Sequence, residues 1–314
     1  MKQKQFYRSS IFHFFALFLF LNCSVALKAV MVNDFLARSF TSTKYSSTIV
    51  YRLYIPRNYS PSTSYPLVIF LHGSGESGND NVKQLCNGAI EWADTTCQNH
   101  YPSFVLVPQC PNGSSWYIGR NGSTLYDIDA TPAKTPMLMV IQLIDSLSHE
   151  FNIDSNRLYS TGLSMGGMGT WEMNLRYPTK FAACLPVCGV GDPSKADRIL
   201  NKPIWAFHGS IDPSVPVEGS RNMISALKAL GGTPKYSEYP WVQHNAWDYA
   251  YKEPDLFQWT FAQSLTTISV TKLSINTSSD TIVYKCSALK CNKSNNKMEF
   301  LKYLCRKSKS IRNC

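Results

Sequence analysis

The fold of this chain is decided at residues 158–167, which read Leu-Tyr-Ser-Thr-Gly-Leu-Ser-Met-Gly-Gly. An apolar strand pattern runs into Gly-x-Ser-x-Gly and then into the start of a helix, the arrangement known as a nucleophile elbow. Gly162 and Gly166 let the backbone turn sharply because neither carries a Cβ atom. The turn is predicted to expose the Ser164 hydroxyl at the end of a sheet. The same string also occurs in ordinary Gly-rich turns, so other parts of the chain must support this interpretation.

An acid and a base follow the serine along the chain. Asp212 comes just after the apolar run Pro203–Phe207, in a polar turn that is typical of a strand end. Of the six histidines, only His244 follows both Ser164 and Asp212. The order Ser, Asp, His is that of α/β-hydrolases and differs from the orders found in chymotrypsin and subtilisin.

These three residue types fit one chemistry. A serine hydroxyl is a poor nucleophile until an imidazole takes its proton. A carboxylate must in turn hold the imidazole in the right tautomer and stabilise its cation. Between Ser164 and His244, Asp192 is the best alternative acid because it also follows a predicted strand. Glu172 and Glu218 fall within helical patterns and are less suitable.

A loop that could stabilise an oxyanion precedes the elbow. The buried-strand run Tyr65–Leu71 is followed by His-Gly-Ser-Gly-Glu, beginning at His72. The fold needs one backbone N–H from this loop and one from the residue after the nucleophile. We assign these donors to Ser74, with Gly75 as the alternative, and to Met165. Each such donor can contribute about 3–4 kcal/mol to the transition state. The simpler interpretation of the loop is a flexible turn with a structural histidine beneath it.

Five segments of the chain resemble the motifs of one protein family. These segments are His72–Glu76, Val107–Pro111, Gly162–Gly167, Phe207–Asp212 and His244–Trp247. They resemble secreted α/β-hydrolases of the carbohydrate-esterase and predicted-peptidase branch, near feruloyl esterases, acetylxylan esterases and polyhydroxybutyrate depolymerases. The resemblance covers roughly residues 45–265 and is more specific for fold and triad than for substrate. It implies Ser164 as nucleophile, Asp212 as acid and His244 as base. It also implies that Trp116 and Trp247 are aromatic pocket residues, and it calls for no cofactor or metal.

Strand and helix patterns alternate through this part of the chain. The predicted strands are Thr48–Ile55, Leu67–Leu71, Ser103–Val107, Arg157–Thr161, Phe181–Val187, Pro203–Phe207 and Lys235–Tyr239. The predicted helices are Met137–Glu150, Met168–Tyr177, Ser220–Leu230 and Glu253–Ala262. The alternation predicts an α/β fold with a mostly parallel central sheet and helices on both faces. Residues 111–136 lack periodicity and are interpreted either as a loop at the mouth of the active site or as a plain surface excursion.

Both ends of the chain differ from its centre. Residues 1–26 combine basic positions with a short apolar run and small residues at 24–26, which predicts a signal peptide cleaved before Leu27. A signal anchor, or acylation at Cys23, is the alternative. Residues 266–314 hold ten basic and two acidic residues, a net charge of +8, which leaves −1 for residues 27–265. The chain is therefore predicted to comprise a leader, a nearly neutral catalytic domain (27–265) and a basic Cys-containing extension.

The charge distribution also limits the partners. The nearly neutral catalytic domain gives no indication of nucleic-acid binding, and no segment beyond the leader is apolar enough for stable membrane insertion. The extension is interpreted either as a weakly ordered basic segment or as a small disulfide-linked module that binds acidic polymers.

Cysteine content and glycosylation sequences agree with an extracellular protein. Without Cys23, nine cysteines remain, an odd number that leaves one thiol outside any intrachain pairing. Cys86 and Cys97 bracket a short segment and could form a bridge, whereas Cys184 and Cys188 lie in an apolar run and are expected to be buried. Asn-x-Ser/Thr sequences begin at Asn58, Asn112, Asn121, Asn276 and Asn292.

The motifs predict a secreted serine hydrolase that cleaves carboxylic esters through an acyl-enzyme. The resemblance implies substrates derived from carbohydrates or plant polymers. A serine peptidase acting on short peptides is the alternative within the same triad chemistry. A lipase is less suitable because no long apolar lid helix is visible in the sequence. A hydrolase fold used only for binding is disfavoured because all three triad positions and both elbow glycines are present.

Overall fold

An eight-stranded sheet forms the centre of the protein. The computed structural model describes residues 33–119, 127–265, 273–276 and 283–286. The strands of this sheet are β1 (Phe35–Ser42), β2 (Ser47–Tyr54), β3 (Tyr65–Leu71), β4 (Phe104–Pro108), β5 (Ile153–Leu163), β6 (Ala183–Val187), β7 (Trp205–Gly209) and β8 (Lys235–Tyr239).

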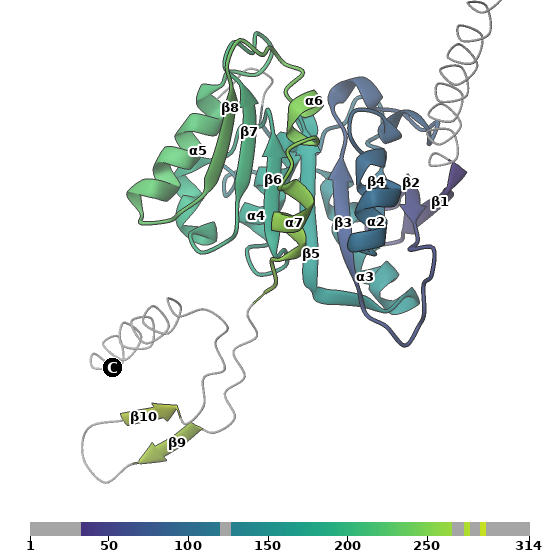
Figure 1. Ribbon diagram of the computed structural model, residues 1–314, viewed down its shortest axis with the longest axis horizontal. Coiled ribbons are helices and arrows are strands. Elements are labelled where there is room, and N and C mark those ends of the chain that lie inside the picture. Colours follow the sequence, from purple (N-terminus) through teal and green to yellow (C-terminus); the bar gives the residue numbers. More distant parts are fainter. Residues whose placement is uncertain (1–32, 120–126, 266–272, 277–282, 287–314) are drawn as a thin grey trace, which may run out of the picture. The chain divides into compact units, whose positions relative to one another are not determined.

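The order of the strands across the sheet is β1-β2-β4-β3-β5-β6-β7-β8 (Figure 1). β1 and β2 pair antiparallel, as do β2 and β4. All later neighbours pair in parallel. This order and these directions are those of the α/β-hydrolase fold, which confirms the predicted mostly parallel sheet.

Six α-helices and four short 3₁₀ turns lie in the described part of the chain. The α-helices are α2 (Thr95–His100), α3 (Thr135–Glu150), α4 (Met165–Arg176), α5 (Glu218–Ala229), α6 (Trp247–Ala250) and α7 (Leu256–Phe261). The 3₁₀ turns are η1 (Ser74–Glu76), η2 (Lys83–Leu85), η3 (Ile90–Ala93) and η4 (Pro193–Ile199).

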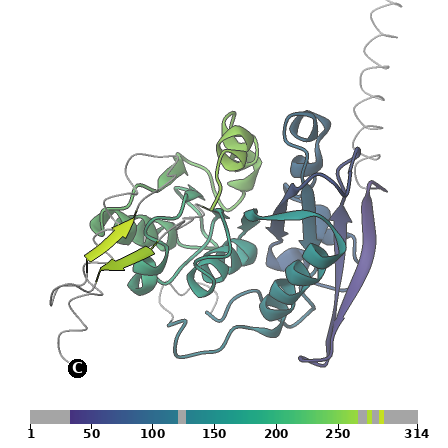
Figure 2. The same ribbon diagram turned by 90° about the horizontal axis from the view of Figure 1, so that it is seen from below.

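Helices cover both faces of the sheet, as the two ribbon views show (Figure 1, Figure 2). On one face, α3 and α4 place Leu143 and Met168 in the same apolar cluster as Ile69 of β3, and α5 continues this layer beside α4. On the other face, the β3 side chain of Phe70 packs 5.5 Å from the Tyr251 ring, centroid to centroid. Because both faces of the central strands are buried, their sequences are continuous apolar runs without alternation.

Every predicted strand of the catalytic domain is present, with ends shifted by a few residues. The helix expected at Met168 begins earlier, at Met165, so it starts directly after the elbow serine. Strand β1 and the short helices α2 and α6 were not predicted. Residues 111–119 and 127–134 contain no helix or strand, in agreement with the predicted loop.

The chain divides into two compact units, Met1–Ser264 and Leu265–Cys314. The second unit contains β9 (Leu273–Asn276), which pairs antiparallel with β10 (Val283–Cys286). The predicted leader and its cleavage site lie outside the described residues. Among the residues that the structure describes, none forms a helix with the length and apolar character that crossing a membrane requires.

Candidate active site

The elbow is built by close backbone approach between β5, β3 and α4. Ser164 follows β5 directly, has φ of +54° and immediately precedes α4. Its N–H donates to the carbonyl of Val187 at 2.9 Å. A Cβ atom on Gly162 or Gly166 would overlap the backbone carbonyl of Leu71. Both elbow glycines are therefore required by the packing, and the turn directs Ser164 away from the sheet.

The structure brings Ser164, Asp212 and His244 into one hydrogen-bonded line. The His244 Nε2 lies 2.9 Å from the Ser164 Oγ, and the His244 Nδ1 lies 2.7 Å from the Asp212 Oδ2. An ionised carboxylate accepts from Nδ1–H, so Nε2 accepts from the serine hydroxyl. The three residues follow β5, β7 and β8, whose carboxyl ends lie at one edge of the sheet. This geometry places the proton acceptor directly on the candidate nucleophile.

Asp212 is held ionised by its surroundings. Its side chain is fully buried, and burial alone would raise the pKa of the carboxyl. Hydrogen bonds from His208 and His244, together with the amides of Val215 and Ser214 at 2.9 and 2.8 Å, outweigh that effect and hold the pKa well below its ordinary range. A carboxylate in this state can stabilise an imidazolium without taking its proton.

The alternative acid, Asp192, has a structural role instead. It is 3% exposed and caps η4, where its Oδ1 accepts from the amide and hydroxyl of Ser194 at 3.1 and 2.6 Å. Its Oδ2 accepts from the amide of Ile128 at 3.2 Å. One carboxylate oxygen is thus bonded by Ser194 of η4 and the other by Ile128, and neither pairs with His244.

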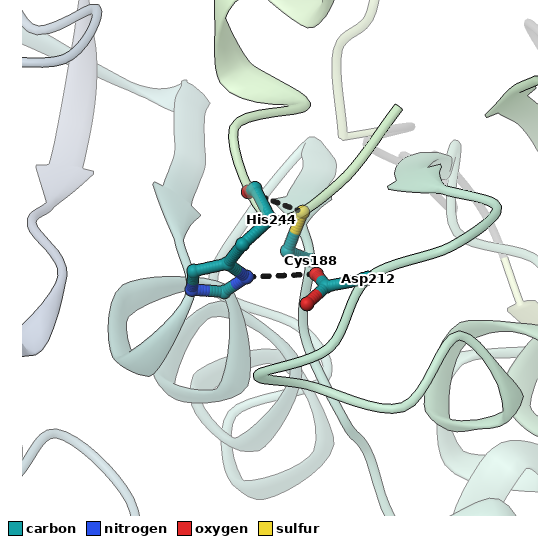
Figure 3. A group of neighbouring side chains, drawn as sticks. All are labelled: Cys188, Asp212 and His244. Atoms are coloured by element: carbon teal, nitrogen blue, oxygen red, sulfur yellow. Dashed lines mark hydrogen bonds and ion pairs between the residues drawn. The ribbon is translucent and has the colours of Figure 1, made fainter. Parts of the chain in front are cut away.

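Two residues that the sequence analysis did not assign also contact the triad. His208, which is fully buried, has its Nε2 3.4 Å from the Asp212 Oδ2, and its Nδ1 lies 2.8 Å from the Ser220 hydroxyl. Cys188 has its Sγ 3.4 Å from the carbonyl oxygen of His244 (Figure 3). Neither contact is visible in the sequence. Cys188 and His244 are distant along the chain, and the contact of His208 with Asp212 depends on the conformation of the loop after β7.

Cys188 lies directly behind the acid and the base. Figure 3 shows its sulfur between the backbone of His244 and the carboxylate of Asp212. Burial raises the pKa of the Cys188 thiol, and the nearby Asp212 carboxylate raises it further, so the thiol is protonated at neutral pH. One potential ligand atom from each of the three residues lies within 4.8 Å of the others. Since Nδ1–H and the carboxylate are already paired, we describe the group as a hydrogen-bonded set.

The loop after β3 lies beside the nucleophile. A Cβ atom built on Gly73 would be 3.6 Å from the Ser164 Cβ. η1 begins at the next residue, Ser74. The amides of Ser74, Gly75 and Met165 donate to no acceptor among the described residues. The two assigned donors, Ser74 and Met165, and the alternative, Gly75, therefore have amides without a backbone partner in the described part of the chain.

His72 and Trp116 support this loop from below. Burial lowers the pKa of His72 to about 4, so its ring is neutral. The Nε2 accepts from the amide of Cys110 at 2.9 Å, which leaves Nδ1–H to donate to the carbonyl of Gly73 at 2.6 Å. The Trp116 indole donates to the His72 carbonyl at 3.1 Å and is fully buried. Trp116, expected in the pocket wall, thus lies in the core under the loop.

Trp247 lies next to the base. It opens α6, and its ring lies edge-on to the His244 imidazole with centroids 5.2 Å apart. The side chain is partly exposed, so of the two expected pocket tryptophans this one has access to solvent beside the triad.

The expected bridge between Cys86 and Cys97 is not formed. Both are free thiols, with Cys86 exposed and Cys97 buried in α2. Cys184 and Cys188 are fully buried, as predicted. The cysteines beyond residue 286 lie outside the described residues, so the pairing considered for the extension stays a prediction.

Comparisons with known proteins agree with this architecture. The chain is 33% identical over 162 residues to a bifunctional acetylxylan esterase/xylanase from Neocallimastix patriciarum, covering 51% of this chain and 21% of that protein. It is 27% identical over 184 residues to a probable feruloyl esterase C from Aspergillus terreus, covering 58% and 62%. A thermostable esterase structure superimposes with a TM-score of 0.69 and 43% identity over 75% of this chain and 64% of that one.

The chain thus spans less than two thirds of each of these relatives. A family model described as phospholipase/carboxylesterase matches residues 60–253, a range that includes the elbow, the acid and the base. The protein therefore belongs to the phospholipase/carboxylesterase family of α/β-hydrolases.

Proposed function

We propose that this protein is a serine hydrolase of carboxylic esters that uses Ser164, His244 and Asp212. The observation that carries the proposal is the continuous hydrogen-bonded line from Asp212 through His244 to the Ser164 hydroxyl, with distances of 2.7 and 2.9 Å. Available amides beside Ser164 add the second requirement of acyl transfer, a place for the oxyanion.

In the proposed reaction, the Ser164 Oγ attacks the ester carbonyl while the His244 Nε2 takes the hydroxyl proton. The amides of Met165 and Ser74 donate to the developing oxyanion. His244 then returns the proton to the leaving alcohol, which leaves an acyl group on Ser164. A water molecule, deprotonated by His244, releases the acid. Asp212 stays ionised throughout, in agreement with its lowered pKa.

We further propose that the ester is carried by a carbohydrate or another plant polymer. The support is the similarity to an acetylxylan esterase and a feruloyl esterase, together with the near-neutral charge of residues 27–265. Secretion belongs to the same proposal, because residues 1–26 have the pattern of a signal peptide. N-terminal sequencing of the mature protein is expected to begin at Leu27.

The proposal is tested with Ser164→Ala and with Ser62→Ala, an exposed serine, as the matched control. On p-nitrophenyl acetate and methyl ferulate, Ser164→Ala is expected to lose at least about 10³-fold in kcat, while the control keeps wild-type rates. A fluorophosphonate probe is expected to label Ser164 alone. Equal rates for wild type and Ser164→Ala would overturn the assignment, and faster cleavage of dipeptide anilides than of any ester would favour a peptidase.

A further inference from the structure

The connection between β8 and α6 begins with a strained reverse turn. The Val242 amide donates to the Tyr239 carbonyl at 3.3 Å, which closes a four-residue turn with Pro240 and Trp241 at its centre. Trp241 has φ of +62°. A turn with proline second and a positive φ third normally has glycine or asparagine at that third position. A bulky side chain there is an outlier that the surrounding structure has to maintain.

The loop that carries the catalytic acid holds this turn in place. The Trp241 amide donates to the Ser210 hydroxyl at 2.9 Å. The Ile211 amide donates to the Val242 carbonyl at 3.2 Å, directly before Asp212. The turn and the acid loop are therefore joined by hydrogen bonds, and His244 follows only three residues after Trp241. The backbone of Trp241 is thus tied to the loop that precedes Asp212.

The side chain of Trp241 packs against almost nothing. It is 83% exposed, the highest value among the exposed large hydrophobic residues of the described chain. Ile211, whose amide bonds to Val242, and Tyr249 of α6 are each about half exposed. The strained backbone reduces stability, and the exposed indole gains no burial that would offset this cost. This combination, on a turn fixed next to the triad, indicates a contact made with a ligand.

A cavity of about 510 Å³ lies against the same connection. Its lining is formed by Tyr239, Asp248, Tyr249, Lys252, Glu253 and Pro254. The rings of Tyr239 and Tyr249 are 5.4 Å apart, and the Tyr239 hydroxyl donates to Glu253 at 2.8 Å. The lining thus combines two aromatic rings with two carboxylates and an ammonium group.

We propose that Trp241 and this cavity bind sugar units of the polysaccharide that carries the ester. A sugar ring offers apolar C–H faces, which suit an exposed indole or phenol ring, and hydroxyl groups, which suit Asp248, Glu253 and Lys252. A lipid surface would require a continuous apolar patch, whereas this lining is interrupted by charges of both signs. The inference rests on the proposed ester hydrolysis and adds to it the recognition of the polymer beside the reacting ester.

The test compares Trp241→Asn with Leu230→Ala, which removes a half-exposed apolar side chain just after α5. The quantity measured is the ratio of kcat/KM on acetylated xylo-oligosaccharides to kcat/KM on p-nitrophenyl acetate. Trp241→Asn is expected to lower this ratio about tenfold, mainly through KM for the oligosaccharide, and Leu230→Ala is expected to leave it unchanged. Because asparagine tolerates a positive φ, the Tm of Trp241→Asn is expected to equal or exceed that of the wild type.

An unchanged ratio would overturn the inference while leaving the proposed hydrolysis intact. A fall of both rates together, or a lower Tm, would assign Trp241 a structural role and would likewise overturn it. If the wild type hydrolyses no ester, the proposed function fails instead. In that case, calorimetry of the wild type and Trp241→Asn with unesterified xylo-oligosaccharide tests binding directly, with weaker binding by the variant expected. A loss of hydrolysis restricted to long-chain p-nitrophenyl esters would assign the surface to lipids and contradict the proposal.

Discussion

At the scale of single residues, the candidate site consists of the hydrogen-bonded side chains of Asp212, His244 and Ser164. His208 and Cys188 contact this line from the side. Ser164, Asp212 and His244 could be selected as candidates because acyl transfer demands those residue types and the fold fixes their order. Cys188 and His208 could not be identified, because their importance comes only from contacts with Asp212 and His244. Such supporting contacts depend on how loops pack and leave no pattern along the chain.

The first prediction concerns the two candidate acids. Asp212→Asn removes the acceptor that fixes the His244 tautomer, so kcat is expected to fall about 10⁴-fold, as the same change does in other Ser-His-Asp enzymes. Asp192→Asn is the matched control, since Asp192 caps η4. It is expected to lower the Tm while kcat on p-nitrophenyl acetate stays within a few fold. A larger loss of kcat in Asp192→Asn than in Asp212→Asn would reverse the assignment.

The second prediction concerns Cys188, whose thiol contacts the His244 carbonyl at 3.4 Å beside Asp212. Cys188→Ala leaves that part-buried carbonyl without this donor, and losing such a bond costs about 1–3 kcal/mol. We expect the lost bond to displace His244 and so to raise the activation free energy by about 1.4 kcal/mol, which lowers kcat/KM roughly tenfold. Cys188→Ser keeps a donor and is expected to recover most of the rate. Kinetics and urea denaturation of both variants measure the effect, and wild-type kcat/KM in Cys188→Ala would contradict it.

At the scale of elements, buried strands were predictable and edge or single-turn elements were not. β3, β5 and β6 are covered on both faces, so their apolar runs are unambiguous. β1 lies at the edge of the sheet and exposes most of its residues, which weakens its pattern. α6 has four residues and exists because the loop after His244 packs there, so local sequence preference does not define it.

The loop between β3 and α2 yields a pH prediction through His72. In the folded protein the pKa of His72 is lowered to about 4, against about 6.5 when it is unfolded. Between pH 4 and pH 6.5 the unfolded chain binds a proton at His72 and the folded protein does not. Protonation of His72 therefore leaves the free energy of unfolding unchanged above pH 6.5 and lowers it progressively as the pH falls to 4. The shift corresponds to at most about 3 kcal/mol.

Urea denaturation of the wild type and of His72→Gln between pH 4 and pH 7 measures this contribution. The glutamine can accept from the Cys110 amide but does not titrate. The difference in the free energy of unfolding between the two proteins is therefore expected to shrink as the pH falls. A difference that is constant over this range would show that His72 does not set the acid sensitivity.

At the scale of the whole molecule, charge and compactness divide the chain at nearly the same place. The compact unit ending at Ser264 contains all the triad residues, and the expected boundary between 265 and 266 lies one residue away. The net charge of +8 belongs to residues 266–314. The charge asymmetry follows from composition alone, because it depends only on counting residues. The position of the exposed Trp241 beside the triad could not be predicted, since a surface arises from loops brought together by the fold.

The last prediction separates the two units by removing residues 265–314. A chain ending at Ser264 keeps the sheet, the triad and the loop after β3, so kcat/KM on p-nitrophenyl acetate is expected to stay within about twofold of the full chain. Retention of the full chain on a cation exchanger or on polygalacturonate is expected to be weak and to vanish in the shortened chain. Residues 27–265 have a net charge of −1, so the net positive charge of the chain without its predicted leader belongs to residues 266–314. With a Debye length of about 8 Å at physiological salt, a few hundred millimolar salt should also release the full chain. Loss of activity on truncation would place the extension within the catalytic core, and equal retention of both chains at low salt would show that its charge has no binding role.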